Sequence, residues 1–245
     1  MMFYRYISEN FTAYINAGEI EAGNADFDYA KMSDADAEEA RASLIEEKGF
    51  FILPSELFCN VRAKAASDEN LNETLEKVFA NIEDSAKGGE GEDDFAGLFA
   101  DFDVNSNKLG ATVAKRNERL VKILNGIADM KLEYKDNAID AFGDAYEYLM
   151  TMYASNAGKS GGEFYTPSCV VRTLVEVLQP YNGRVYDPAC GSGGMFVQSA
   201  KFIERHSGNI NNLSVYGQDS NPTTWKMAQM NLAIRGIEAN LGEYN

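Results

Sequence analysis

Asp187-Pro188-Ala189-Cys190-Gly191-Ser192-Gly193-Gly194 is the stretch that decides the fold. A short apolar run at residues 184–186 predicts a strand before it, and a second apolar run at residues 195–200 predicts a helix after it. An acidic residue therefore ends a strand, and a glycine-rich turn opens a helix. Because glycine has no Cβ, such a turn can approach a ligand closely and adopt torsions that other residues avoid. Turns of this kind usually hold a nucleotide or a nucleoside.

The position of the acidic residue narrows the choice of ligand. In a dinucleotide-binding fingerprint the glycines come first, the acid follows about 20 residues later, and the turn cradles an anionic pyrophosphate. Here Asp187 stands directly at the turn, where a carboxylate repels phosphate but suits a ligand with a cationic centre and hydrogen-bond donors. S-adenosylmethionine, with its sulfonium and α-amino groups, fits that description. The plainer alternative is a tight turn that an acid caps without any ligand.

The sequence predicts two domains that differ in secondary structure. Residues 1–158 are expected to form a helical N-terminal domain, and residues 159–245 to form part of an α/β domain in which strands and helices alternate. In the first part, helical spacing or composition predicts helices near residues 3–15, 35–47, 71–82, 115–129 and 141–153. In the second part, helices are expected at residues 167–178, 195–206 and 222–236, and strands at residues 185–187 and 213–218. Glycine-rich segments predict an acidic loop at residues 88–94 and a hinge at residues 156–162.

A second acidic residue is predicted at the same edge of the sheet. In parallel α/β sheets, ligands lie at the carboxyl ends of the strands, and Asp219 ends the strand that follows Asp187. It is well placed to accept hydrogen bonds from two ribose hydroxyls, although a solvated acid at a strand end is the plainer interpretation. Asn221 is expected to cap the next helix, with Pro222 at its first position.

An aromatic segment lies upstream of the glycine turn. It reads Glu163-Phe164-Tyr165-Thr166-Pro167-Ser168, and two aromatic side chains beside a glycine pair can flank a cofactor. Thr166 is a suitable N-cap for a helix with Pro167 in its first turn. The same pattern also suits an ordinary loop that leads into a capped helix.

The negative charge of the chain is concentrated in residues 1–158. The net charge is −16; residues 159–245 hold seven basic and seven acidic residues, so the other 15 basic and 31 acidic residues all lie in residues 1–158. An acidic surface repels nucleic acid, so any contact with DNA is expected to be local or delegated to another subunit. A solvated acidic face without a partner is an equally good interpretation of this charge.

The cysteines favour a reducing cytoplasm and predict no catalytic thiol. Three cysteines far apart in the sequence make neither a metal cluster nor a disulfide framework, and we expect no signal peptide and no membrane span. Cys190 is expected to be a small packed residue. As a nucleophile it would need a base, and the only histidine, His206, lies at the far end of the following helix.

Several motifs in order resemble the modification subunits of type I restriction–modification systems, which are adenine-specific DNA methyltransferases. The resemblance is carried by Glu163–Pro167, Asp187–Gly194, Gly217–Asp219 and Met230–Ile237, and upstream by Phe3–Ser8, Gly49–Pro54 and Asp144–Leu149. It covers essentially the whole chain, and the order and spacing of the blocks make it specific. It implies a helical N-terminal domain followed by a partial Rossmann-like domain that binds S-adenosylmethionine.

The resemblance also implies roles for individual residues. Glu163, Phe164, Tyr165, Thr166, Pro167 and Ser168 match a motif that contacts the methionine end of the cofactor; Asp187 and the turn Gly191, Ser192, Gly193, Gly194 match the main cofactor loop; Asp219 matches the ribose-binding acid. The family's acid at this last position is often Glu. The implied partners are a specificity subunit, a restriction subunit and, in the full complex, duplex DNA.

The sequence departs from the family in one decisive block. Members of the family bind the flipped target adenine with an Asn-Pro-Pro-Phe or Asn-Pro-Pro-Tyr block. This chain has no such block, so its sequence offers no catalytic residue. Its one Asn-Pro pair is the predicted helix cap at Asn221, and the next strand is expected to begin only near Asn245. The chain is therefore expected to be a fragment or truncated product that binds cofactor without methylating DNA. The alternatives are a non-catalytic assembly module and a nicotinamide-dependent dehydrogenase, against which Asp187 argues.

Overall fold

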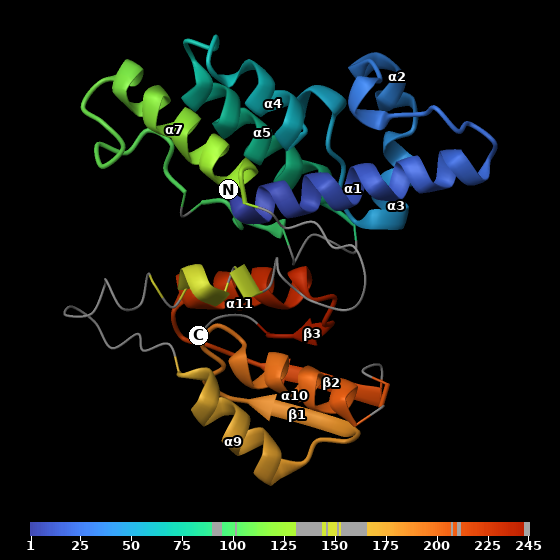
Figure 1. Cartoon of the computed structure of the whole chain (residues 1–245), viewed down its shortest axis with the longest axis vertical. Coiled ribbons are helices and arrows are strands. Elements are labelled where there is room, and N and C mark those ends of the chain that lie inside the picture. Colours follow the sequence, from blue (N-terminus) through green and yellow to red (C-terminus); the bar gives the residue numbers. More distant parts are fainter. Residues whose placement is uncertain are drawn as a thin grey trace. The chain divides into compact units, whose positions relative to one another are not determined.

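A computed structural model of the chain forms two compact units, Met1–Lys131 and Leu132–Asn245 (Figure 1). The structure describes residues 1–89, 95–100, 102–130, 144–145, 147–150, 152, 166–206, 208–209 and 212–242. The predicted boundary between residues 158 and 159, the predicted hinge and most of the predicted loop lie outside the described residues, and they stay predictions. Of the helix predicted at residues 141–153, the structure describes residues 144–145, 147–150 and 152, and these are helical as predicted.

The first unit is helical in its described part, as predicted. Its helices are α1 (Met2–Glu21), α2 (Asp34–Glu39), α3 (Arg41–Lys48), α4 (Phe58–Ala65), α5 (Leu71–Ala86) and α7 (Val113–Ala128), with short 3-10 turns η1 (Tyr29–Lys31) and η2 (Pro54–Glu56). Tyr4 of α1 is fully buried, and its ring meets Phe79 of α5 edge-on with centroids 5.4 Å apart. Arg5 Nη1 donates to the carbonyl oxygen of Ile127 at 2.6 Å, where the negative end of the α7 dipole favours a cation.

The prediction of a single helix over residues 35–47 is wrong, because the chain forms two helices that meet at Ala40. The amide of Ala40 donates to the carbonyl of Ala37 at 3.1 Å, which closes α2 with a tight turn. Ser33 caps α2 through its side chain, and Gly49 ends α3 in the left-handed conformation. Composition rich in Ala and Glu favours helix throughout this stretch, but it carries no signal for a break at Ala40.

The second unit contains a parallel sheet, as predicted from the alternation of strands and helices. Its elements run α9 (Ser168–Leu178), β1 (Gly183–Asp187), α10 (Gly194–Arg205), β2 (Leu213–Gly217), α11 (Pro222–Ile234) and β3 (Ala239–Asn240). The three described strands lie in the order β1-β2-β3, and both neighbouring pairs are parallel. Asp187 is in register with Gly217, so β1 and β2 end level with each other.

The third strand was missed by the sequence analysis, which expected the next strand only near Asn245. β3 pairs with β2 through Val215↔Ala239 and Tyr216↔Asn240. Two residues are too few to show an alternating pattern, so this strand exists only through its pairing.

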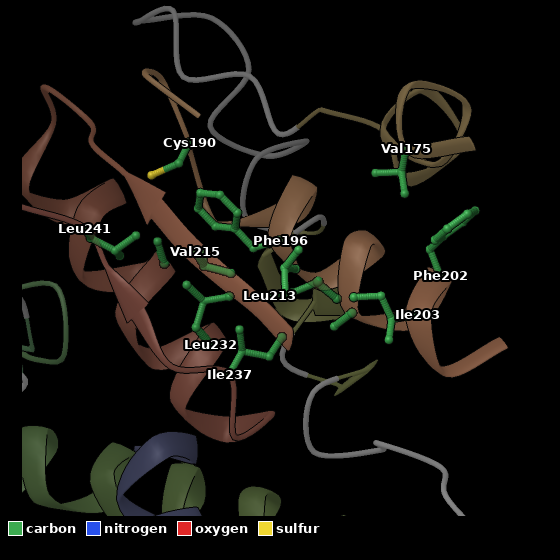
Figure 2. Close-up of a cluster of buried hydrophobic side chains, with 13 residues drawn as sticks. Val175, Cys190, Phe196, Phe202, Ile203, Leu213, Val215, Leu232, Ile237 and Leu241 are labelled. Atoms are coloured by element: carbon green, nitrogen blue, oxygen red, sulfur yellow. The ribbon is translucent and has the colours of Figure 1, made fainter. Parts of the chain in front are cut away.

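A hydrophobic core lies between the sheet and its helices. Phe196 and Ala228 are fully buried, and Val215 and Leu232 are nearly so. Figure 2 shows side chains of this cluster, with Phe196, Val215 and Leu232 gathered around the strands. The ring of Phe196 lies so close to Gly217 that a Cβ there would meet ring carbons at 2.8 and 2.9 Å. The end of β2 therefore depends on a glycine.

The opposite face of the sheet is open among the described residues. Tyr186 of β1 is 60% exposed and Tyr216, its partner in register on β2, is 38% exposed. Parallel strands are usually covered on both faces, so this exposure is unusual. None of the helices in the described part of the chain is long and apolar enough to cross a membrane.

Candidate cofactor-binding site

The ends of β1 and β2 continue side by side into the glycine turn. Beyond the last paired residues, the amide of Gln218 donates to the carbonyl of Asp187 at 3.2 Å, and the amide of Cys190 donates to the carbonyl of Gln218 at 2.9 Å. These bonds continue the backbone hydrogen bonding between β1 and β2 beyond the ends of the two strands. They hold the segment around Asp219 against the turn that follows Asp187.

The turn itself has the backbone that the sequence predicts. Gly191 has φ +57° and Gly193 has φ +81°, and Gly193 is the N-cap of α10. A Cβ added at Gly191 would meet no atom within 4 Å, so the turn faces open space there. Positive φ at both positions is readily adopted by glycine and strained for most other residues.

The two predicted acidic residues meet at this turn. Asp219 Oδ2 accepts a hydrogen bond from the amide of Gly191 at 3.0 Å, and its Oδ1 accepts from the amide of Asn221 at 2.9 Å. Asp187 Oδ1 accepts from the amide of Ala189 at 3.1 Å. Each carboxylate oxygen has more than one lone-pair direction, so both acids can still accept hydrogen bonds from a ligand.

The charge at the turn is negative. No lysine or arginine in the described ranges forms an ion pair with Asp187 or Asp219, and both residues are partly exposed. The site therefore suits ammonium or hydroxyl donors and a positively charged sulfonium rather than phosphate. Burial, together with the negative charges of Asp187 and Asp219, raises the pKa of the Cys190 thiol to about 12.

Cys190 is accordingly expected to resist alkylation in the folded chain. At pH 8 a thiol with that pKa holds about a thousandfold less thiolate than one at the ordinary value of 9.0. Iodoacetamide should label the exposed Cys169 in the native chain and reach the buried Cys190 only after unfolding in guanidinium, as peptide mass spectrometry would show. Equal labelling rates in the native state would contradict this. Because the pKa of Cys190 is raised on folding, its contribution to stability is complete below pH 9 and lost as pH rises towards 12.

The upstream motif lies partly within the described residues. Glu163, Phe164 and Tyr165 lie outside them, so their predicted role stays a prediction. Thr166 and Ser168 are exposed and share a pocket with residues of the glycine turn; its lining is Glu147, Thr166, Ser168, Val171, Ser192, Gly194, Val197, Gln198 and Asn231. The pocket brings the upstream motif to the main cofactor turn.

Thr166 is not the cap of the helix that follows. α9 begins at Ser168, and its N-cap is Pro167, which makes no side-chain cap hydrogen bond. The carbonyl of Pro167 accepts from the amides of Val170 and Val171 at 2.9 and 3.2 Å, so the first helical bonds start one residue later than predicted. Pro167 keeps an extended ψ of 135°, which places it just outside the helix. The predicted cap at Asn221 is confirmed, because its side chain accepts from the amides of Thr223 and Thr224.

Three polar residues beside the turn were given no role by the sequence analysis. Asn231 Nδ2 donates to the carbonyl of Ser192 at 2.8 Å, and Arg235 Nη1 donates to Asn231 Oδ1. Arg235 Nη2 lies 3.3 Å from Glu147 Oε2. The only local signal in the sequence is the four-residue spacing of Asn231 and Arg235, which puts them on one face of a helix.

Comparisons with known proteins agree with this arrangement. A family model described as the HsdM N-terminal domain matches residues 1–127, and one described as N-6 DNA Methylase matches residues 137–244. The crystal structure of a type I restriction–modification system methyltransferase subunit from Streptococcus thermophilus superposes with a TM-score of 0.77 at 25% identity, over 99% of this chain and 52% of that one.

Curated relatives point the same way. The methylase subunit of the type I restriction enzyme MpnII from Mycoplasma pneumoniae is 42% identical over 249 residues, which cover 97% of this chain and 45% of the relative. The methylase subunit of the type I restriction enzyme HindI from Haemophilus influenzae is 56% identical over 108 residues, which cover 44% of this chain and 24% of the relative. The chain spans less than half the length of these relatives. It belongs to the family of methylase subunits of type I restriction–modification systems, with a helical HsdM N-terminal domain followed by an N-6 DNA methylase domain.

Proposed function

We propose that the second unit binds S-adenosylmethionine at the carboxyl edge of its sheet. The observation that carries the proposal is the hydrogen bond from the amide of Gly191 to Asp219 Oδ2 at 3.0 Å. It brings the glycine turn and both acidic strand ends to one place. The open space at Gly191 and the two carboxylates without described cationic partners fit a nucleoside that carries a positive centre.

Each residue of the site has a distinct task in this proposal. Asp187 faces the positively charged end of the ligand, and Asp219 accepts hydrogen bonds from the ribose hydroxyls. The turn Gly191–Gly194 lets the ligand approach the backbone closely. The segment Glu163–Ser168, with Phe164 and Tyr165 as flanking rings, contacts the methionine end. When bound, S-adenosylmethionine supplies a methyl group activated by its sulfonium.

The complete subunit, in this proposal, transfers methyl to the N6 amine of adenine in duplex DNA, in the cytoplasm, with a specificity subunit and a restriction subunit as partners. This chain supplies the cofactor site and lacks the adenine-binding Asn-Pro-Pro block. Its Asn221-Pro222 pair is used otherwise, because the Asn221 side chain caps α11. We therefore propose that the 245-residue chain alone does not methylate DNA.

A non-catalytic assembly role is the second candidate, and the missing block favours it. In that case the helical unit docks to a specificity subunit while the second unit binds no cofactor. Mixing the chain with a specificity subunit would then give a stable complex without methyl transfer and without cofactor binding.

Titration calorimetry with S-adenosylmethionine tests the proposal, with NAD as the control ligand. Saturable binding of S-adenosylmethionine alone is the expected result, because the acid at the turn disfavours a pyrophosphate. Binding of NAD would favour a dehydrogenase instead. Absence of binding by either ligand would overturn the cofactor proposal and favour the assembly role.

The chain by itself is expected to bind duplex DNA weakly at physiological salt. Its net charge of −16 repels phosphates, and tight non-specific binding depends on basic side chains that release counterions. Fluorescence anisotropy with a labelled duplex should give a dissociation constant no tighter than about 10⁻⁴ M, the weak end of non-specific binding. Tight binding that falls steeply with salt would instead reveal a local basic surface.

A further inference from the structure

A chain of polar contacts, buried at Asn231 and Arg235, runs from the glycine turn to helical residues near position 147. Asn231 is 2% exposed, and its Nδ2 donates to the carbonyl of Ser192 at 2.8 Å. Arg235, whose side chain is 5% exposed, donates to Asn231 Oδ1. Its Nη2 lies 3.3 Å from Glu147 Oε2 and 3.8 Å from Asp144 Oδ1. Four residues from two segments of the second unit thus connect to one carbonyl of the turn.

The chemistry of these groups fixes the direction of each contact. A guanidinium only donates hydrogen bonds, so the atom of Asn231 that faces Arg235 must be its carbonyl oxygen. The amide nitrogen of Asn231 is therefore directed at Ser192, where it can only donate. Arg235 in this way determines which end of the Asn231 amide meets the turn.

The turn needs such a contact because glycine is its main component. Ser192 lies between Gly191 and Gly193, both at positive φ, and glycines lose the most conformational freedom when a turn is fixed. A buried arginine in turn needs a carboxylate partner, because an unpaired buried charge is strongly destabilising. Glu147 at 3.3 Å is the nearer of two carboxylates beside Arg235, the other being the exposed Asp144 at 3.8 Å. The geometry of the turn is thereby tied to a residue 45 positions upstream of it, through α11.

We propose that Asn231, Arg235 and Glu147 are positioning residues that hold the glycine turn in the conformation that binds the cofactor. The part of this inference that concerns ligand affinity rests on the proposed function. The part that concerns the turn itself does not, because it rests only on contacts between residues of this chain.

Two variants of the full 245-residue chain test the inference. Asn231→Asp keeps the size of the side chain and a partner for Arg235, but it presents a carboxylate oxygen instead of a donor to the carbonyl of Ser192. Glu147→Gln keeps the shape and removes the charge that pairs with Arg235. Glu176→Gln is the matched control, because its carboxylate lies 3.0 Å from Arg205 Nη1 in a pair that joins α9 to α10 and has no hydrogen bond to the described turn.

Hydrogen–deuterium exchange of the ligand-free chain is the first readout. Both variants should raise the exchange rate of the peptide over residues 187–196 about tenfold more than that of the peptides of β2 and β3, even though the loss of a carboxylate partner for Arg235 in Glu147→Gln lowers the unfolding midpoint. S-adenosylmethionine affinity, measured by calorimetry, should fall about tenfold in both variants and stay unchanged in Glu176→Gln.

The outcomes separate this inference from the proposed function. Unchanged exchange at residues 187–196 in Asn231→Asp overturns the positioning role, whether or not the parent chain binds the cofactor. Faster exchange with unchanged affinity overturns it as well. If the parent chain binds no S-adenosylmethionine, the proposed function is overturned. If the variants still exchange faster than that parent chain at residues 187–196, the role of the three residues at the turn is supported.

Discussion

Replacing Asp187 by alanine is expected to reduce affinity for S-adenosylmethionine by about a hundredfold, the effect of losing a charge-assisted hydrogen bond to a cationic ligand. Asp187 ends β1 directly before the glycine turn, and no described lysine or arginine competes for its carboxylate. The helical unit should remain folded, because it is a separate compact unit. Calorimetry gives the affinity and far-UV circular dichroism checks the fold.

Two further variants separate charge from turn geometry. Asp187→Asn keeps an oxygen that can accept from the amide of Ala189, as Asp187 Oδ1 does at 3.1 Å, and it loses only the negative charge. It should therefore also bind weakly. Glu204→Ala removes an exposed acid near the far end of α10 and should bind normally. If Asp187→Asn binds like the parent chain while Asp187→Ala does not, the carboxylate serves only the turn.

Replacing Phe196 by alanine is expected to lower the free energy of unfolding of the second unit by about 3–5 kcal/mol, the usual effect of emptying a buried aromatic site. Phe196 is fully buried in the core, and its ring lies against Gly217 at the end of β2. A loss of this size is a large fraction of the roughly 5–15 kcal/mol by which domains are stable. Cofactor binding should weaken with it, because the ring supports the strand ends that carry the site.

Guanidinium unfolding measures this effect through a single probe. Trp225 is the only tryptophan of the chain and packs against the same core from α11, so its fluorescence reports on the second unit alone. Tyr186→Ala is the matched control on β1; its ring is 60% exposed, and it should change stability by no more than about 0.5 kcal/mol. A midpoint for Phe196→Ala equal to that of Tyr186→Ala would contradict the assigned core.

The predicted fold class is confirmed in the parts that depend on local patterns. Helical spacing located α1, α5 and α7, and the alternation of short apolar runs located β1, β2, α9, α10 and α11 within a few residues. The residues at 35–47 and the start of α9 show where local patterns fail. Both depend on one or two backbone hydrogen bonds that composition does not encode.

The residues of the candidate site also fall into those that the sequence predicts and those that only the structure shows. The sequence singled out Asp187, the turn Gly191–Gly194 and Asp219, and in the structure the amide of Gly191 joins the turn to Asp219. It gave no role to Asn231, Arg235 and Glu147, because their contacts join residues far apart in the sequence. A buried polar residue such as Asn231 carries no local mark of its partner in the sequence.

By itself, the sequence determined the turn, the cap at Asn221 and the alternation that predicts a parallel sheet, because torsions, caps and periodicity are properties of neighbouring residues. Only the tertiary structure decided that Asp219 reaches Gly191, that a two-residue strand completes the described sheet, and that Asn231 holds Ser192. These features depend on strand register and on the packing of α11. Register and packing are fixed by the free energy of burying the whole core, which no single stretch of sequence contains.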